Sequence, residues 1–128
     1  MARVLIVDDD EQDLLLLKTI LADAGHEIFL ASNGEDALKL YLRNPIEVVV
    51  TDIAMPRGDG VELITSLKGL DPSAAIIAVS GQRPHRLDIA QLAGAKKILV
   101  KPIEKDGLID AVEEALNPPD SQAFDPNR

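Results

Sequence analysis

The 128-residue sequence contains no cysteine and few aromatic residues. Without cysteine, disulfide bonds, thiolate zinc sites and a cysteine nucleophile are excluded. The aromatic content of 2% leaves few side chains that could stack on nucleic-acid bases. It also means that the core must be built from Leu, Ile, Val and Ala. Basic residues are also scarce, because 13 Lys and Arg stand against 22 Asp and Glu, a net charge of −9. We therefore expect no direct nucleic-acid binding over the surface, although a local basic patch stays open.

Long hydrophobic runs are absent as well. Nowhere do about 18 apolar residues follow one another, as a membrane span would need. The N-terminal run from Met1 to Val7 continues directly into acidic residues, without the long apolar segment and cleavage site of a signal peptide. We therefore expect a cytoplasmic protein with no membrane partner. A content of 46% hydrophobic and 27% charged residues is typical of one globular domain of this length.

Short apolar runs alternate with longer helical patterns along the chain. The unbroken run Val4-Leu5-Ile6-Val7 is typical of a strand buried on both faces of a parallel sheet. Runs of this kind and one half-buried pattern predict five strands. These strands cover residues 4–7, 26–31, 46–51, 75–79 and 98–100.

Apolar residues at helical spacing fill the intervals between these runs. Gly25 is a C-terminal stop for the first helix, and Ser32 with Glu35 forms a capping-box pattern that opens the second. A helix after Pro84 has a thin apolar face made of Leu87, Ile89, Ala90 and Leu92. The other helices are predicted at residues 14–24, from Ser32 to about Leu42, at 61–67 and at 108–116.

Five strand and helix units predict a doubly wound α/β fold with right-handed crossovers. We expect a five-stranded parallel sheet in the order 2-1-3-4-5, flavodoxin-like, with five helices on its two faces. The domain should cover residues 1–117, and residues 118–128 have no periodicity and are expected to be disordered.

Chemically useful residues follow the predicted strands at their carboxyl ends, where sheets of this kind bind ligands. Asp8 and Asp9 follow the first strand and Asp52 the third, whereas Ser80 and Lys101 follow the fourth and fifth. In the order 2-1-3-4-5 the first and third strands are neighbours, so the three carboxylates should meet in one crevice. Such a cluster either binds protons or recruits a cation, because like charges at close range raise one another's pKa.

A hard divalent ion such as Mg²⁺ suits this oxygen-rich cluster, and Mg²⁺ sites commonly include a phosphate oxygen. Lys101 adds a positive charge and Ser80 a hydroxyl donor, both suited to a phosphoryl group. Phosphoryl transfer depends mainly on positioning and charge neutralisation, and a carboxylate can itself be the nucleophile. Asp52 stands alone at its strand end and is the candidate nucleophile.

Five separated motifs occur in order on these strand ends: residues 4–10 (VLIVDDD), residues 51–63 (TDIAMPRGDGVEL), Ser80-Gly81, Gly94-Ala95 and Lys101-Pro102. From Arg3 to Leu116 the chain resembles a response-regulator receiver domain of two-component signalling.

The resemblance implies that Asp52 accepts a phosphoryl group from a sensor histidine kinase or a histidine phosphotransfer protein. It implies that Asp8, Asp9, Asp52 and the backbone carbonyl of Ala54 hold Mg²⁺. It also implies that Lys101 contacts the phosphoryl group, that the Lys101-Pro102 peptide bond is cis, and that Ser80 is the switch hydroxyl. Such a domain catalyses only its own phosphorylation and slow dephosphorylation, and it signals to a downstream protein or effector domain that the sequence does not identify.

Two other functions stay open. A small Mg²⁺-dependent phosphatase resembling the haloacid dehalogenase class would also use an aspartate nucleophile, but that class has a second Asp two places later, where this chain has Ala54. A phosphorylation-independent interaction scaffold would be favoured by loss of the acidic pair, Asp52 or Lys101, and all are present.

The chain departs from the usual receiver pattern at the fifth strand. Ile98 stands where these domains usually have a switch Tyr or Phe, and Ser80 replaces the more usual Thr. The residues after Leu116 are too few for an effector domain. We therefore expect either a stand-alone receiver or the N-terminal module of a longer regulator.

Overall fold

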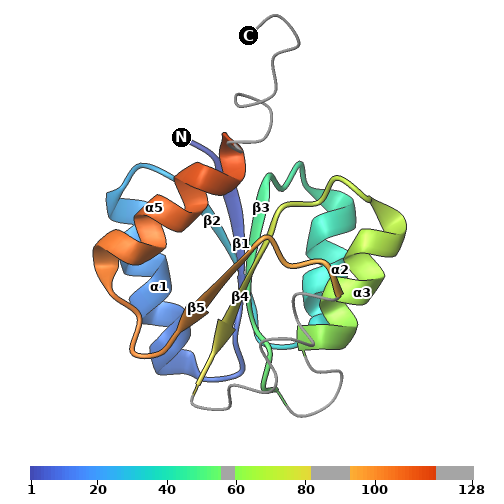
Figure 1. The fold of residues 1–128 in the computed structure, drawn as a ribbon, viewed down its shortest axis with the longest axis horizontal. Coiled ribbons are helices and arrows are strands. Elements are labelled where there is room, and N and C mark those ends of the chain that lie inside the picture. The colour runs from blue at the N-terminus through green and yellow to red at the C-terminus, as the bar shows by residue number, and fades with distance from the viewer. Residues whose placement is uncertain (56–59, 82–92, 118–128) are drawn as a thin grey trace, which may run out of the picture.

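The computed structural model describes residues 1–55, 60–81 and 93–117, and its centre is a parallel sheet (Figure 1). The strand order is β2-β1-β3-β4-β5, which confirms the predicted order 2-1-3-4-5. The strands are β1 (Arg3–Val7), β2 (Glu27–Ala31), β3 (Val48–Asp52), β4 (Ile76–Ser80) and β5 (Lys97–Val100).

Four helices lie within the described residues: α1 (Glu11–Asp23), α2 (Gly34–Arg43), α3 (Gly60–Leu70) and α5 (Lys105–Leu116). Helices α1 and α5 cover one face of the sheet, and α2 and α3 cover the other (Figure 1). The helix predicted after Pro84 and the tail predicted at residues 118–128 lie outside the described residues. No helix of the described chain is long and apolar enough to cross a membrane. The cytoplasmic location stays a prediction.

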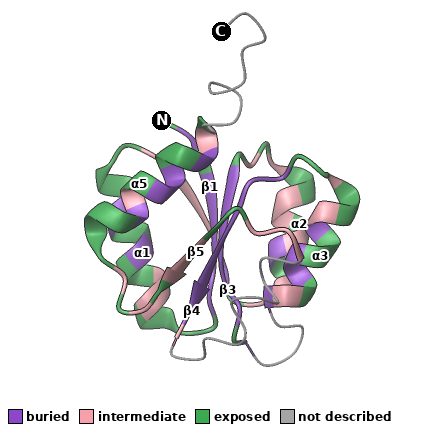
Figure 2. Cartoon of the chain, in the orientation of Figure 1, coloured by how far each residue is buried: buried purple, intermediate pink, exposed green. Residues whose placement is uncertain are grey.

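The sheet separates two apolar clusters because alternate residues of a strand point to opposite faces. In β1, Val4 and Ile6 join the cluster under α1 and α5, whereas Leu5 and Val7 join the cluster under α2 and α3. All five residues of β3 and of β4 are buried, as Figure 2 shows for the central strands. Burial on both faces explains why these strands have unbroken apolar runs.

The predicted cap of the second helix was wrong by one residue. Asn33, not Ser32, is the N-cap of α2, and its side-chain oxygen accepts a hydrogen bond of 2.8 Å from the Asp36 backbone N–H. Both residue types cap helices well. The extended backbone continues through Asn33, at φ −157° and ψ 167°, so the helix begins only at Gly34. Gly25, at φ 96°, follows the end of α1 as predicted.

Parallel pairing brings the carboxyl ends of the strands to one edge of the sheet. Val7 pairs with Thr51, Asp52 with Val79, and Ser80 with Val100. Strand β3 extends one residue beyond the predicted end and includes Asp52. Asp52 is therefore the last residue of the strand and is held by the sheet, whereas the sequence placed it directly after the strand.

Candidate functional site at the carboxyl edge of the sheet

Asp52 is the last residue of β3, and its side chain is only 7% exposed. The Ala54 backbone N–H donates a hydrogen bond of 2.9 Å to Asp52 Oδ1. The chain after Asp52 is fixed on both sides, because Ile53 N donates to the Val79 carbonyl and Gly60 N donates to the Ile53 carbonyl. The carboxylate thus has a fixed position at the mouth of the crevice.

The residues after β1 bring two further carboxylates to Asp52. Asp8 is buried and Asp9 is exposed. One carboxylate oxygen from each of Asp8, Asp9 and Asp52 lies within 4.8 Å of the others. The predicted convergence of the three carboxylates is therefore found. An all-oxygen, anionic donor set of this kind fits a hard divalent cation.

Asp8 has an unusual environment for a carboxylate. Burial raises the pKa of Asp8 from 3.8 to about 6, the Asp10 N–H opposes this shift, and the neighbouring Asp52 charge adds to it. The Asp10 N–H donates a hydrogen bond of 2.9 Å to Asp8 Oδ1, which fixes the side chain below the start of α1. The shift indicates that the metal-free cluster holds its negative charges at a cost in free energy.

Lys101 is the cation of the cluster. The peptide bond between Lys101 and Pro102 is cis, as the resemblance implied. Lys101 Nζ lies 2.7 Å from Asp13 Oδ2, 3.1 Å from Asp52 Oδ2 and 3.4 Å from Asp8 Oδ2. Burial alone would lower the pKa of Lys101, but its hydrogen bonds to Asp13 and Asp52 and the neighbouring negative charges raise that pKa above its usual range. The ammonium group therefore stays charged at neutral pH.

Asp13 also belongs to this site, although the sequence did not predict it. Asp13 lies in the first turn of α1, three residues after the N-cap Asp10, whose side chain also accepts a hydrogen bond from the Asp13 N–H. An acid in a first helical turn is ordinarily explained by the helix dipole, so nothing in the local sequence distinguishes Asp13. Only the folded structure, which brings the first turn of α1 next to the residue after β5, shows that Asp13 contacts Lys101.

The two remaining predicted site residues flank this cluster. Ser80 ends β4, is buried, and its carbonyl accepts a hydrogen bond of 2.8 Å from Lys101 N. This bond ties the switch candidate to the residue that carries the ammonium group. Ala54 is exposed, and its N–H contacts Asp52. The roles of the Ser80 hydroxyl and the Ala54 carbonyl stay predictions.

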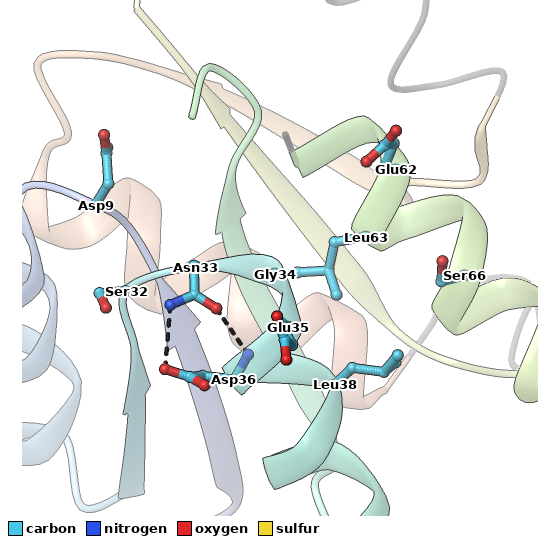
Figure 3. Close-up of a pocket in the computed structure, with 10 residues that line it drawn as sticks. All are labelled: Asp9, Ser32, Asn33, Gly34, Glu35, Asp36, Leu38, Glu62, Leu63 and Ser66. Carbon is cyan, nitrogen blue, oxygen red and sulfur yellow. Dashed lines mark hydrogen bonds between the residues drawn. The ribbon is translucent and has the colours of Figure 1, made fainter. Parts of the chain in front are cut away.

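Two cavities adjoin the cluster on opposite sides. A cavity of about 730 Å³ has Asp9 at one end and lies between the start of α2 and the side chains of Glu62, Leu63 and Ser66 on α3 (Figure 3). A second cavity, of about 400 Å³, is lined by Asp13, Leu16, Lys101 and Pro102 among others. Asp9 lines the first cavity and Asp13 the second, whereas Asp52 lines neither of them.

Known proteins are similar to this chain in sequence and in fold. Residues 4–113 match the family described as response regulator receiver domain. The chain is 37% identical over 118 residues to the chemotaxis protein CheY of Bacillus subtilis, covering 90% of this chain and 98% of that protein. It is 31% identical to the transcriptional regulatory protein GlrR of Escherichia coli, covering 90% of this chain but 26% of that protein. The response regulator protein TrrA of Thermotoga maritima, solved in complex with Mg²⁺ and BeF, superposes with a TM-score of 0.84 at 34% identity, covering 91% of this chain and all of that one.

Proposed function

Because the chain belongs to the response regulator receiver domain family, we propose that Asp52 is its phosphoacceptor. The observation that carries this proposal is the contact of 3.1 Å between Asp52 Oδ2 and Lys101 Nζ inside a cluster of carboxylates. Asp52 is the member of that cluster that is fixed by the sheet and adjoins the ammonium group. Asp8 and Asp9 surround it with the charge that a divalent cation would neutralise.

The proposed reaction needs no general base. A carboxylate oxygen of Asp52 attacks the phosphorus atom of a phosphohistidine, the P–N bond breaks, and the imidazole nitrogen leaves with the electron pair. Lys101 neutralises charge on the phosphoryl oxygens during this transfer. In dephosphorylation, water attacks the same phosphorus atom, inorganic phosphate leaves, and the Asp52 carboxylate is restored.

Asp8, Asp9 and Asp52, with the backbone carbonyl of Ala54, would hold Mg²⁺. A bound Mg²⁺ supplies positive charge that stabilises negative charge developing on the phosphoryl oxygens. Without it, three carboxylates would repel an anionic phosphodonor, and Lys101 alone cannot balance them. The oxygen donor set supports this choice of ion over softer transition metals.

We infer that the phosphodonor is a sensor histidine kinase or a histidine phosphotransfer protein, since receiver domains take their phosphoryl groups from histidine kinases. Some relatives carry further domains, as the 26% coverage of GlrR shows. A downstream protein or effector domain would then detect the phosphorylated state. Ser80 is the proposed switch hydroxyl, because it ends the strand next to Asp52 and its backbone accepts from Lys101.

The test is phosphorylation by acetyl phosphate with Mg²⁺, followed by intact-protein mass spectrometry. The wild-type chain should gain one phosphoryl group and Asp52→Asn none. Asp110→Asn is the matched control, because Asp110 is exposed on α5 and lies outside the cluster. Labelling of Asp52→Asn equal to wild type would overturn the assignment. Phosphate release from small esters in large excess over the protein would instead favour a phosphatase.

A further inference from the structure

Asp13 gives the ammonium group of Lys101 its shortest ion pair. The Asp13 contact is 2.7 Å, against 3.1 Å to Asp52 and 3.4 Å to Asp8. A lysine ammonium group has three N–H donors and no acceptor. Three carboxylate oxygens lie within hydrogen-bond distance of Lys101 Nζ, as many as the group has donors. A further anion would therefore compete with one of these carboxylates.

Asp13 lies outside the set of carboxylates that surround the candidate metal position. That set consists of Asp8, Asp9 and Asp52. Asp13 comes from the first turn of α1, and its side chain is 33% exposed, whereas Asp8 and Asp52 are 1% and 7% exposed. Its contact with the site runs through Lys101.

Phosphorylation of Asp52 would add negative charge next to Lys101. A carboxylate with one negative charge becomes an acyl phosphate, whose terminal oxygens carry about two negative charges at neutral pH. Lys101 is the cationic side chain among the described contacts of Asp52, so the new charge competes with Asp13 for the same donors. The Asp13 carboxylate also adds a negative charge beside a group that is becoming more negative.

We propose that Asp13 competes with the phosphoryl group for the Lys101 ammonium group and thereby weakens the phosphorylated state. This inference rests on the proposed function of Asp52 and Lys101. Asp13 is a regulatory positioning residue in it, since it acts on the reaction only through Lys101. Removal of its charge should free one ammonium donor for the phosphoryl oxygens and increase the affinity of the site for a phosphoryl mimic.

The experiment measures binding of beryllofluoride, formed from beryllium and fluoride salts at saturating Mg²⁺, by fluorine NMR titration. Asp13→Asn preserves the shape of the side chain, and Asp13→Ala removes the acceptor entirely. Both variants should bind beryllofluoride about threefold to fivefold more tightly than wild type, the range of one partly exposed ion pair. Glu11→Gln is the matched control, because it removes one exposed acid from the same helical turn without touching Lys101. The control should bind as wild type does.

The outcomes separate this inference from the proposed function. If the wild-type chain binds no beryllofluoride and accepts no phosphoryl group, the function proposed for Asp52 fails, whatever Asp13 does. If wild type binds and both Asp13 variants bind equally or more weakly, competition is refuted and Asp13 is an anchor for Lys101 or a bystander. An equal gain in Glu11→Gln would also refute it, because the effect would then be one of net charge. Melting temperatures of all variants establish that each is folded.

Discussion

Gly60 lies directly against the backbone of Asp52, so closely that a Cβ atom at position 60 would overlap the Asp52 carbonyl oxygen and lie 2.6 Å from Ile53 Cα. Helix α3 begins at this glycine. The close approach locks the start of α3 onto the segment that presents the candidate phosphoacceptor. A side chain at Gly60 would have to displace backbone, which cannot yield as a flexible side chain can.

We therefore expect Gly60→Ala to destabilise the fold by about 2–3 kcal/mol, the upper range for overpacking in a core. It should also slow phosphorylation of Asp52, because the displaced backbone is that of the acceptor. Gly69→Ala is the control on the same helix, since nothing lies within 4 Å of a Cβ atom there. That control should be neutral or stabilising by up to about 1 kcal/mol. Urea denaturation measures both, and equal stabilities for the two variants would contradict the close packing at Gly60.

The sequence predicted the framework of the site because buried parallel strands have unbroken apolar runs, and the polar residues that end those runs must meet at one edge. Asp8, Asp52, Ser80 and Lys101 could all be placed in this way. Asp13 could not, because it lies in the first turn of α1 and not at the end of a strand, so the strand pattern does not place it next to Lys101. The cap of α2 was misplaced for a different reason, since Ser32 and Asn33 are equally good capping residues and only the backbone angles decide between them.

Metal binding should stabilise the fold through the acidic cluster. A ligand that binds only the folded state adds stability by mass action, about 2.7 kcal/mol at a hundred times its dissociation constant. We expect Mg²⁺ to raise the melting temperature of the wild-type chain, and Asp9→Asn to lose most of that increase because one of three anionic donors is gone. Glu11→Gln, two residues away and outside the cluster, should keep it. Equal Mg²⁺ responses in Asp9→Asn and wild type, measured by differential scanning calorimetry, would show that the ion binds elsewhere.

Asp8 should make the metal-free fold less stable as the pH rises. Its pKa is raised from 3.8 to about 6, so between these values the folded state binds a proton that the unfolded state releases. The contribution of Asp8 to stability is therefore greatest below about pH 4, falls as the pH rises to 6, and is lost above that. Asp8→Asn keeps the acceptor for the Asp10 N–H and removes the charge.

We therefore expect Asp8→Asn to be more stable than wild type by about 1–2 kcal/mol at pH 7.5 in EDTA, because the variant does not bury a negative charge at position 8. At pH 4 the two proteins should be nearly equal in stability. Urea denaturation at both pH values measures this. A difference that is the same at pH 4 and pH 7.5 would mean that the substitution acts through packing, not through the charge of Asp8.

The hydrogen bond between Tyr41 and Asp71 should link α2 to the segment after α3. Tyr41 OH donates to Asp71 Oδ2 at 2.8 Å. Burial, the hydrogen bond and the Asp71 charge together raise the pKa of Tyr41 to about 12. The hydrogen bonds that Asp71 accepts from Ser73 and Tyr41 lower the pKa of Asp71. The contribution of this hydrogen bond to stability should thus be complete up to about pH 10 and disappear as the pH rises through 12. It should also weaken in acid, as Asp71 is protonated.

This chain allows a direct measurement of that link, because it has one tyrosine and no tryptophan. Ultraviolet absorbance of the phenolate during an alkaline titration therefore reports Tyr41 alone. We expect a midpoint near pH 12 in wild type and a lower one in Asp71→Asn, which removes the negative charge but leaves the burial of the ring. Tyr41→Phe should cost about 1 kcal/mol near pH 7, the net value of one hydrogen bond to a partly exposed acceptor. Identical midpoints in wild type and Asp71→Asn would show that burial alone sets the pKa of Tyr41, and that Asp71 does not hold α2 against the segment after α3.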